Sequence, residues 1–363
     1  MSTAATDRAW VATRKGLVEL RLRGTRWQIE RLSFSGEPVS AVLPPDSQGR
    51  MLAALNLGHF GVKLHASDDG GGSWREVATP AYPPQPEGDA GKGPAWKLLQ
   101  VWTMARGGDG TVWAGTLPGG LFRSTDVGSS WQLVEPLWQQ PARLEWFGGG
   151  YDAPGIHSVC PHPRNDDELL VGVSCGGAWV TRDGGDSWTV QTQGMVADFM
   201  PPERAADPNI QDPHRIVRCA AAPDVLWCQH HNGIWRSSDA AASWQRLHPS
   251  LSAFGFAVAA HPQDPLTAWF VPGVKDERRI PVNAALAVTR TRDGGQTFEE
   301  LREGLPQQHC YDLVYRHGLD IAADGRRLLM GSTTGNLWSS GDGGDSWAQV
   351  SGHLPPVYDL RFG

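Results

Sequence analysis

The chain has 363 residues, of which 40% are hydrophobic and 20% are charged, as in an ordinary soluble globular protein. Its formal net charge is -7 at pH 7 and it has no long basic run, so a nucleic-acid partner is not favoured. Five cysteines, an odd number without a small-domain framework, indicate free thiols in a reducing compartment. The start lacks an apolar signal core and no stretch could span a membrane, which predicts a cytoplasmic protein without a membrane partner.

The N-terminal segment WVATRKGLVELRLRGTRWQIE, residues 10–30, predicts three β-strands. After it, short β-prone runs alternate with turn residues, and 44 glycines and 27 prolines suit many short strands joined by turns. A motif of the type TRDGGDSW recurs about every 55 residues, which indicates a repeat architecture. Its closing aromatic residues are Trp74, Trp131, Trp188, Trp244, Phe298 and Trp347.

One repeat, residues 155–190, predicts a four-stranded antiparallel meander with the runs IHSVC, ELLVGVS, AWVTR and SWTV. The first strands of the repeats are expected at residues 39–43, 98–104, 156–160, 215–221, 254–260, 310–315 and 357–362. The last run, VYDLRF, has no strands after it, whereas the N-terminal segment lacks a first strand. We therefore expect VYDLRF to pair beside residues 10–13 and complete one sheet from both chain ends.

These repeats resemble the Asp-box (BNR) propellers, a superfamily that includes sialidases, xyloglucanases, sortilin-type receptors and a photosystem assembly factor. The chain is also similar to bacterial members labelled glycosyl hydrolase or exo-sialidase-like. The resemblance implies an all-β fold, a single seven-bladed β-propeller of four-stranded antiparallel blades over residues 1–363. It is specific for a fold and unspecific for a function.

The repeated motif is interpreted as the turn between the third and fourth strands of each blade. Asp183 can accept hydrogen bonds from the turn, Gly185 can adopt a positive φ, and Trp188 can bury its ring against the next blade. Blade five carries Ala241 where the others carry glycine, which predicts a modified turn. The aspartates assigned this structural role are Asp69, Asp126, Asp183, Asp239, Asp293 and Asp342.

Three connections, residues 75–97, 133–155 and 189–214, are longer than a step between blades needs. They keep several large aromatic residues, which predicts folded, lid-like loops. The shorter loops and first strands of blades four to seven carry histidines, acids, arginines and a tyrosine. We expect these side chains to converge at the mouth of the channel, opposite the aspartate turns.

The expected ligand is small, polar and anionic or carbohydrate-like, with sialidase-like hydrolysis as an extension of that hypothesis. Guanidinium groups suit a carboxylate, and imidazole suits proton transfer. The residues assigned to ligand binding are His157, His214, Arg215, Lys275 and Arg278. The residues assigned to catalysis are His230, His231, Asp312, Tyr311 and Asp276.

Two other interpretations stay open. A divalent metal is one, because imidazoles are common ligands, with the candidates His157, His214, His230, His231 and His309. A non-enzymatic scaffold that binds a protein partner is the other.

The Arg-Ile-Pro signature of sialidases is expected near the first blade, but in this chain it occurs at residues 279–281, in the sixth.

Overall fold

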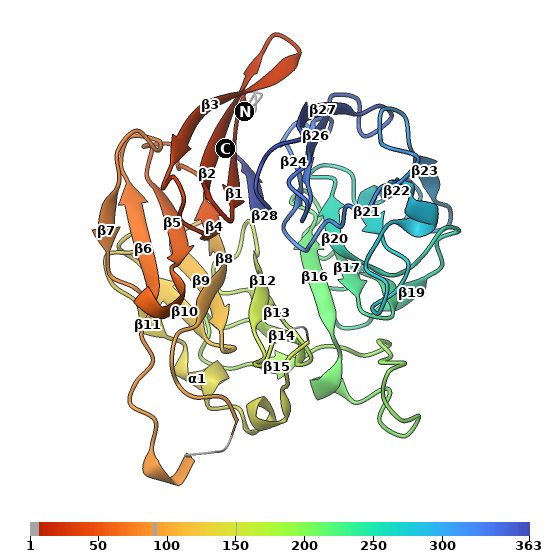
Figure 1. Ribbon diagram of the computed structural model, residues 1–363. Coiled ribbons are helices and arrows are strands. Elements are labelled where there is room, and N and C mark those ends of the chain that lie inside the picture. Colours follow the sequence, from red (N-terminus) through yellow and green to blue (C-terminus); the bar gives the residue numbers. More distant parts are fainter. Residues whose placement is uncertain (1–6, 90–92, 150) are drawn as a thin grey trace. The chain divides into compact units, whose positions relative to one another are not determined.

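The computed structural model describes residues 7–89, 93–149 and 151–363, so short parts of two predicted loops lie outside it. The described chain forms seven sheets, each of four antiparallel strands, which confirms the predicted fold class of a seven-bladed β-propeller (Figure 1). It divides into two compact units: Met1–Gly36 with His214–Gly363, and Glu37–Pro213. Among the described residues, no helix has the length and apolar character that crossing a bilayer requires.

The first unit holds blades 1, 5, 6 and 7. In order across its sheet, blade 1 consists of β28 (Val357–Phe362), β1 (Arg8–Thr13), β2 (Gly16–Arg23) and β3 (Arg26–Ser33). Blade 5 consists of β16 (Pro213–Arg218), β17 (Leu226–His230), β18 (Gly233–Ser237) and β19 (Gln245–Leu247). Blade 6 consists of β20 (Gly255–Ala260), β21 (Ala268–Pro272), β22 (Val288–Thr291) and β23 (Glu299–Leu301), with the short helix η5 (Val282–Ala284). Blade 7 consists of β24 (Leu319–Ile321), β25 (Leu328–Gly331), β26 (Leu337–Ser340) and β27 (Ala348–Ser351).

The second unit holds blades 2, 3 and 4. Blade 2 consists of β4 (Val39–Leu43), β5 (Met51–Asn56), β6 (Val62–Ser67) and β7 (Arg75–Val77). Blade 3 consists of β8 (Gln100–Arg106), β9 (Val112–Leu117), β10 (Leu121–Ser124) and β11 (Gln132–Leu133). Blade 4 consists of β12 (Ile156–Pro161), β13 (Leu169–Val173), β14 (Gly177–Thr181) and β15 (Thr189–Val190). The loops add the short helices η1 (Gly58–Phe60), η2 (Glu87–Asp89), α1 (Glu135–Trp138), η3 (Pro141–Glu145) and η4 (Pro208–Ile210).

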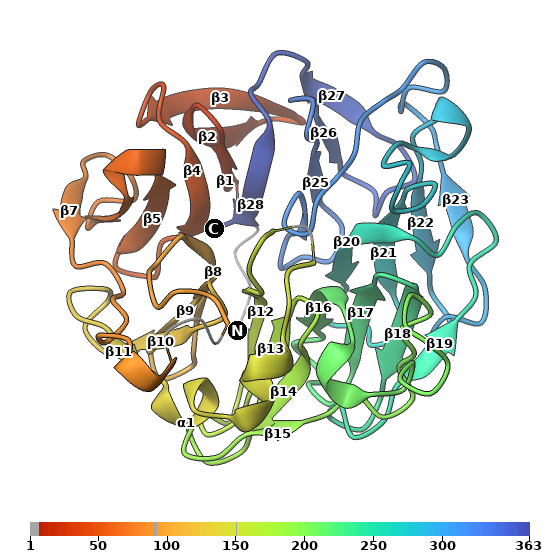
Figure 2. The same cartoon turned by 60° about the horizontal axis from the view of Figure 1, so that its bottom comes forward.

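The two chain ends complete blade 1, as predicted. Strand β28 pairs antiparallel with β1, with Val11 opposite Leu360 and Ala9 opposite Phe362. Figure 2 shows β28, from the C-terminus, beside β1. The pairing satisfies the backbone groups of two segments that would otherwise each present an open sheet edge.

The predicted first strand of blade 7, residues 310–315, is wrong. The strand that pairs with β25 is β24, which begins at Leu319. The earlier segment follows a positive φ of 52° at His309 and runs as an irregular loop. Its Asp312 side chain is hydrogen-bonded to the loop between β25 and β26, and the Thr333 N–H of that loop donates to the carbonyl of Leu313 (2.8 Å). These contacts hold the segment without a strand ladder.

Within each unit, the hydrophobic clusters lie between blades that follow each other. Trp269 of blade 6 shares a buried cluster with Met330 of blade 7, and Leu52 of blade 2 shares one with Phe122 of blade 3. Trp188 is buried in a cluster that blade 4 shares with blade 3. Consecutive blades therefore exclude water together, as neighbouring units in repeat proteins do.

The six aspartate turns have the same hydrogen bonds in both units. In blade 4, Asp183 Oδ1 accepts from Thr181 Oγ1 (2.7 Å) and from the Ser187 backbone N–H (2.9 Å), and Oδ2 accepts from Ser187 Oγ (2.5 Å). The Asp183 carboxylate is exposed, unlike Trp188. In blade 5, Ala240 and Ala241 adopt φ of 55° and 70°, where blade 4 has glycines, yet Asp239 keeps its bonds to Ser243. The turn at Ala241 therefore keeps the geometry of the other turns, and the prediction that this turn is modified is wrong.

These hydrogen bonds stabilise the ionised carboxylates. The Ser187 side chain and backbone N–H and the Thr181 hydroxyl lower the pKa of Asp183 from 3.8 to about 2. The corresponding bonds lower the pKa values of Asp69, Asp126 and Asp293 to about 2 as well. A folded pKa below the unfolded value means that the contribution to stability is complete above about pH 4 and is lost as the pH falls toward 2.

We therefore expect the melting temperature to fall steeply between about pH 4 and pH 2, followed by circular dichroism. Asp183→Asn should lower stability at pH 7 and reduce this acid dependence. Asp186→Asn, in the same turn, is the control and should leave the acid profile unchanged. An unchanged profile in Asp183→Asn would show that other carboxylates control acid unfolding.

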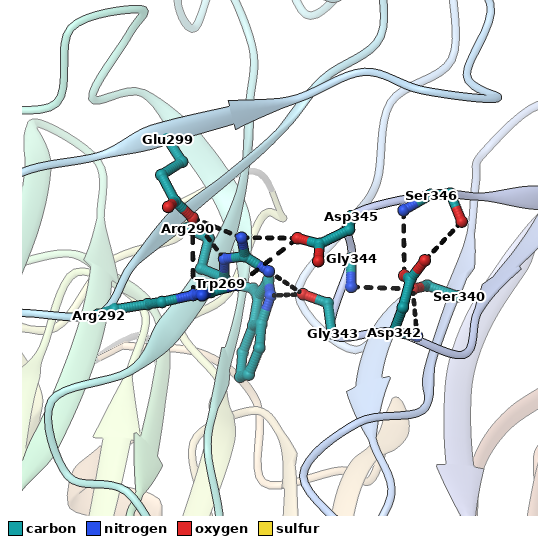
Figure 3. A network of polar contacts seen from close by, with 10 residues as sticks. All are labelled: Trp269, Arg290, Arg292, Glu299, Ser340, Asp342, Gly343, Gly344, Asp345 and Ser346. Atoms are coloured by element: carbon teal, nitrogen blue, oxygen red, sulfur yellow. Dashed lines mark hydrogen bonds and ion pairs between the residues drawn. The ribbon is translucent and has the colours of Figure 1, made fainter.

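Blades 6 and 7 are also joined by a polar network (Figure 3). Arg290 of β22, whose side chain is 4% exposed, contacts Glu299 (2.5 Å) and Asp345 (2.7 Å). It also donates to the carbonyl of Gly343 (2.7 Å), which accepts from the indole N–H of Trp269 as well (2.7 Å). A buried guanidinium therefore connects the outer part of blade 6 to the aspartate turn of blade 7.

The long loops of the second unit are folded where the structure describes them. Trp138 contacts the rings of Tyr82 (4.8 Å) and Trp96 (5.2 Å), and the Arg143 guanidinium lies over it at 3.9 Å. The first two long loops therefore pack against each other. In the third, the Gln211 amide donates to two backbone carbonyls of the same loop.

Candidate functional site

The predicted site residues of the first unit lie in four segments of blades 5 to 7: β16, the end of β17 with the turn after it, the hairpin between β21 and β22, and the loop before β24. Strand β16 carries His214 and Arg215, and the turn after β17 carries His231. Neighbouring residues on a strand project to opposite sides, which separates some of the predicted pairs.

His230 and His231 differ in environment. His230 is fully buried, its Nδ1 accepts from the backbone N–H of Asn232 (3.1 Å), and its ring packs on Trp235 at 4.6 Å. His231 is half-buried, with its ring 5.3 Å from that of His214. Of the two, His231 has the exposure that contact with a ligand would require.

His214 is buried and closely oriented. Its Nδ1 lies 2.7 Å from the carbonyl oxygen of Gly255, and its ring stacks on Phe256 at 4.3 Å with an interplanar angle of 11°. Because a carbonyl oxygen only accepts, Nδ1 must carry a proton, and in the neutral ring the lone pair is then on Nε2. Gly255 and Phe256 of β20 therefore fix the ring plane of His214 and place a proton on its Nδ1.

Phe256 is the centre of a group of cations and rings, which we name the Phe256 cluster: Phe256, His214, Arg279, Tyr315 and Arg316. The guanidinium groups of Arg279 and Arg316 lie over the Phe256 ring at 5.3 Å and 5.5 Å. The Tyr315 ring meets it edge-on at 4.9 Å. Each cation can gain from the negative face of the ring.

Arg279 comes from the hairpin between β21 and β22. Its Nε and Nη2 donate to Asp276 Oδ1 (3.0 and 2.6 Å), and Nη1 lies 3.4 Å from Tyr315 Oη. Burial lowers the pKa of Arg279, but Tyr315 and Asp276 outweigh burial and raise it. Asp276 therefore orients a permanent cation whose remaining nitrogen is directed toward Tyr315.

Lys275 and Arg278 lie at the exposed tip of the same hairpin and form a backbone bridge with each other. The Lys275 ammonium is 3.1 Å from Glu277. These side chains add positive charge near the cluster without a buried position. The sequence analysis assigned Arg278 to ligand binding, whereas the contacts favour Arg279 for that role. The signal in the sequence was an acid and an arginine three residues apart, Asp276 and Arg279.

Asp312 is enclosed by donors. Its Oδ1 accepts from Ser332 Oγ (2.6 Å), Thr334 Oγ1 and Asn336 Nδ2 (2.8 Å), and Oδ2 accepts from the Cys310 thiol (3.2 Å). Burial favours the neutral acid, but the hydrogen bonds from Ser332, Thr334 and Asn336 outweigh it and lower the pKa of Asp312. The carboxylate thus stays ionised and holds the loop after β25.

Three other predicted residues, Tyr311, His309 and Arg215, are not members of the Phe256 cluster. Tyr311 is 59% exposed and His309 is exposed as well. Arg215 is buried and contributes, after Arg361, to the positive field at Asp320, whose pKa is nevertheless raised by burial.

His157 belongs to the second unit. It is fully buried in β12, its Nδ1 is 2.9 Å from Ser158 Oγ, and its ring meets Trp102 at 5.5 Å.

Comparison with known proteins shows similarity of fold and no match in sequence. No protein-family model matches the sequence, and no curated protein matches it. An ancestral GH74 enzyme has a similar structure at 14% identity with a TM-score of 0.60, over 93% of this chain and 38% of the enzyme. YCF48 bound to D1 peptide is similar at 17% identity with a TM-score of 0.52, over 95% and 93% of the two chains.

YCF48 from Cyanidioschyzon merolae is similar at 14% identity with a TM-score of 0.54, over 87% of this chain and 86% of that one. At such identities the likeness shows a shared fold alone. This chain spans 38% of the length of the GH74 enzyme, so most of that enzyme has no counterpart in it.

Proposed function

We propose that this protein binds a small anionic ligand at the Phe256 cluster. The observation that carries the proposal is the pair of guanidinium groups, Arg279 and Arg316, over one aromatic ring. Two cations held close together suit a ligand that has a carboxylate or phosphate. His231 and the exposed hairpin tip supply further positive or polar groups.

The binding geometry follows from the Arg279 contacts. Asp276 holds Nε and Nη2, so Nη1 together with Tyr315 Oη is the part that an anion would meet. Asp276 is a positioning residue in this scheme. A ligand carboxylate would accept from both groups, and such charge-assisted hydrogen bonds are stronger than neutral ones.

Hydrolysis would require more of this site than binding does. A glycosidase needs one carboxyl that can give up a proton and a second group that attacks or stabilises. Asp312 is held ionised by its donors, and Asp276 is paired with Arg279. These environments favour binding over acid catalysis. The aspartate turns support placing the chain among the Asp-box propellers, which include both enzymes and binding proteins.

A protein partner is the second candidate. The second long loop of the second unit exposes Leu144 (53%), Phe147 (40%) and Tyr151 (49%). One structurally similar protein holds a peptide. Exposed apolar side chains on a folded loop are typical of such contacts.

The test is calorimetric titration of the purified chain with citrate, phosphate and N-acetylneuraminic acid. We expect one of them to bind, and Arg279→Gln to weaken binding about 10- to 100-fold through loss of a charge-assisted pair. Arg302→Gln is the matched control, because Arg302 forms an ion pair with Glu300 (2.9 Å) on the same blade. This variant should bind the anion normally.

Equal affinity in both variants, or binding of none of the three anions, would refute the cluster as an anion site. Release of sugar from a glycoside, lost in Asp312→Asn, would favour the hydrolase hypothesis. A peptide that binds normally to Arg279→Gln but not to Phe147→Ala would favour the protein-partner hypothesis.

A further inference from the structure

His214 and His231 form a pair of imidazoles at the start of blade 5. Ligand atoms of the two side chains lie within 4.8 Å of each other, with ring centroids 5.3 Å apart. Two imidazoles at this separation can reach one ion with modest side-chain adjustment, because metal–nitrogen bonds are about 2.0–2.1 Å long. The pair lies beside the Phe256 cluster and shares His214 with it.

The hydrogen bond to Gly255 prepares His214 for ligation. A metal-binding histidine typically donates its other ring N–H to a carbonyl or carboxylate, which fixes the tautomer and the ring direction. His214 does this through Nδ1 at 2.7 Å, while the stack on Phe256 fixes the ring plane. In the neutral ring the lone pair is on Nε2, so Nε2 is the atom that would ligate an ion.

We propose that His214 and His231 bind a divalent transition-metal ion, with water molecules at the other coordination positions. Two imidazoles suit Zn²⁺, and also the other divalent ions that imidazole binds. Such a set leaves positions for exchangeable ligands. The inference goes beyond anion binding, since it rests on ligand chemistry rather than on the arginines.

The test uses the full chain without an affinity tag, treated with chelator and titrated with Zn²⁺ by calorimetry. Co²⁺ absorption provides the coordination readout. We expect one ion per chain. His231→Ala should weaken binding at least tenfold, because a half-buried turn residue can be removed without disturbing a strand. His248→Ala, an exposed histidine elsewhere on blade 5, should bind normally.

Arg279→Gln should keep the metal, so that loss of anion binding and loss of metal binding are separate results. The proposal is overturned if the wild-type chain takes up no stoichiometric ion, or if His231→Ala binds as tightly as His248→Ala.

Discussion

Gly304→Ala is expected to destabilise the protein by about 2–5 kcal/mol, the sum of a steric clash and backbone strain. Gly304 follows β23 with a φ of +78°, and an added Cβ would lie 1.8 Å from the carbonyl oxygen of Trp347. That oxygen is backbone, so no rotamer change removes the clash. The contact joins blades 6 and 7, because the Trp347 N–H donates to the carbonyl of Glu303 (3.0 Å). Unfolding in guanidinium chloride should show the loss as a lower midpoint concentration of denaturant.

Gly341→Ala is the matched control. Gly341 lies in the aspartate turn of blade 7, and an added Cβ would meet nothing within 4 Å. We expect a change within about 0.5 kcal/mol, typical of open surface positions. If both variants unfold at the same midpoint, the close approach of the two blades at Gly304 is not maintained in solution.

The blades were predictable from the sequence because their signal is local and repeated. A turn needs an aspartate, a hydroxyl residue two positions earlier and a residue that tolerates positive φ, and each repeat states this in about eight residues. The pairing of the chain ends was also predictable, since VYDLRF had no partner within its own repeat. The turns depend on neighbours in the chain, whereas the pairing of the ends follows from counting the strands of each repeat.

The first strand of blade 7 was missed because two segments compete for it. Residues 310–315 have the stronger β-propensity, yet Asp312 binds the loop after β25 and withdraws its segment from the ladder. Leu319 and Ile321 take the place instead, in a strand with a less apolar sequence. A side-chain contact over about twenty residues outweighed local propensity, and the repeat pattern does not encode it.

The candidate site was predicted in part. The histidines and the charged hairpin were identified, but Phe256 and Arg316 were not, because a phenylalanine in a strand and an arginine before one are ordinary residues in sequence. Their contact with each other comes from packing between blades 6 and 7. Likewise, the burial that separates His230 from His231 reflects strand alternation, which the pair of letters HH does not show.

Arg290→Met is expected to lower stability by about 2–3 kcal/mol. Methionine keeps much of the side-chain length, so the change removes hydrogen bonds and charge rather than volume. Removal of one member of a buried pair costs about 3–5 kcal/mol, but Glu299 and Asp345 are 50% and 56% exposed and regain water, which reduces the loss. The Gly343 carbonyl keeps its bond from Trp269, which limits the loss further.

The network itself supplies the control for Arg290. Arg292 reaches the same carboxylates, Glu299 at 3.7 Å and Asp345 at 3.5 Å, from a side chain that is 55% exposed (Figure 3). Arg292→Met should therefore cost less than about 1 kcal/mol, as exposed ion pairs do. Salt should diminish the effect of Arg292→Met and leave most of that of Arg290→Met, since buried pairs are screened less. Equal losses in urea unfolding at low salt would mean that Arg290 acts as an ordinary surface charge. A larger loss for Arg290 would instead establish the buried guanidinium as a specific link between blades 6 and 7, the pair of sheets on which the Phe256 cluster also depends for Arg279 and Tyr315.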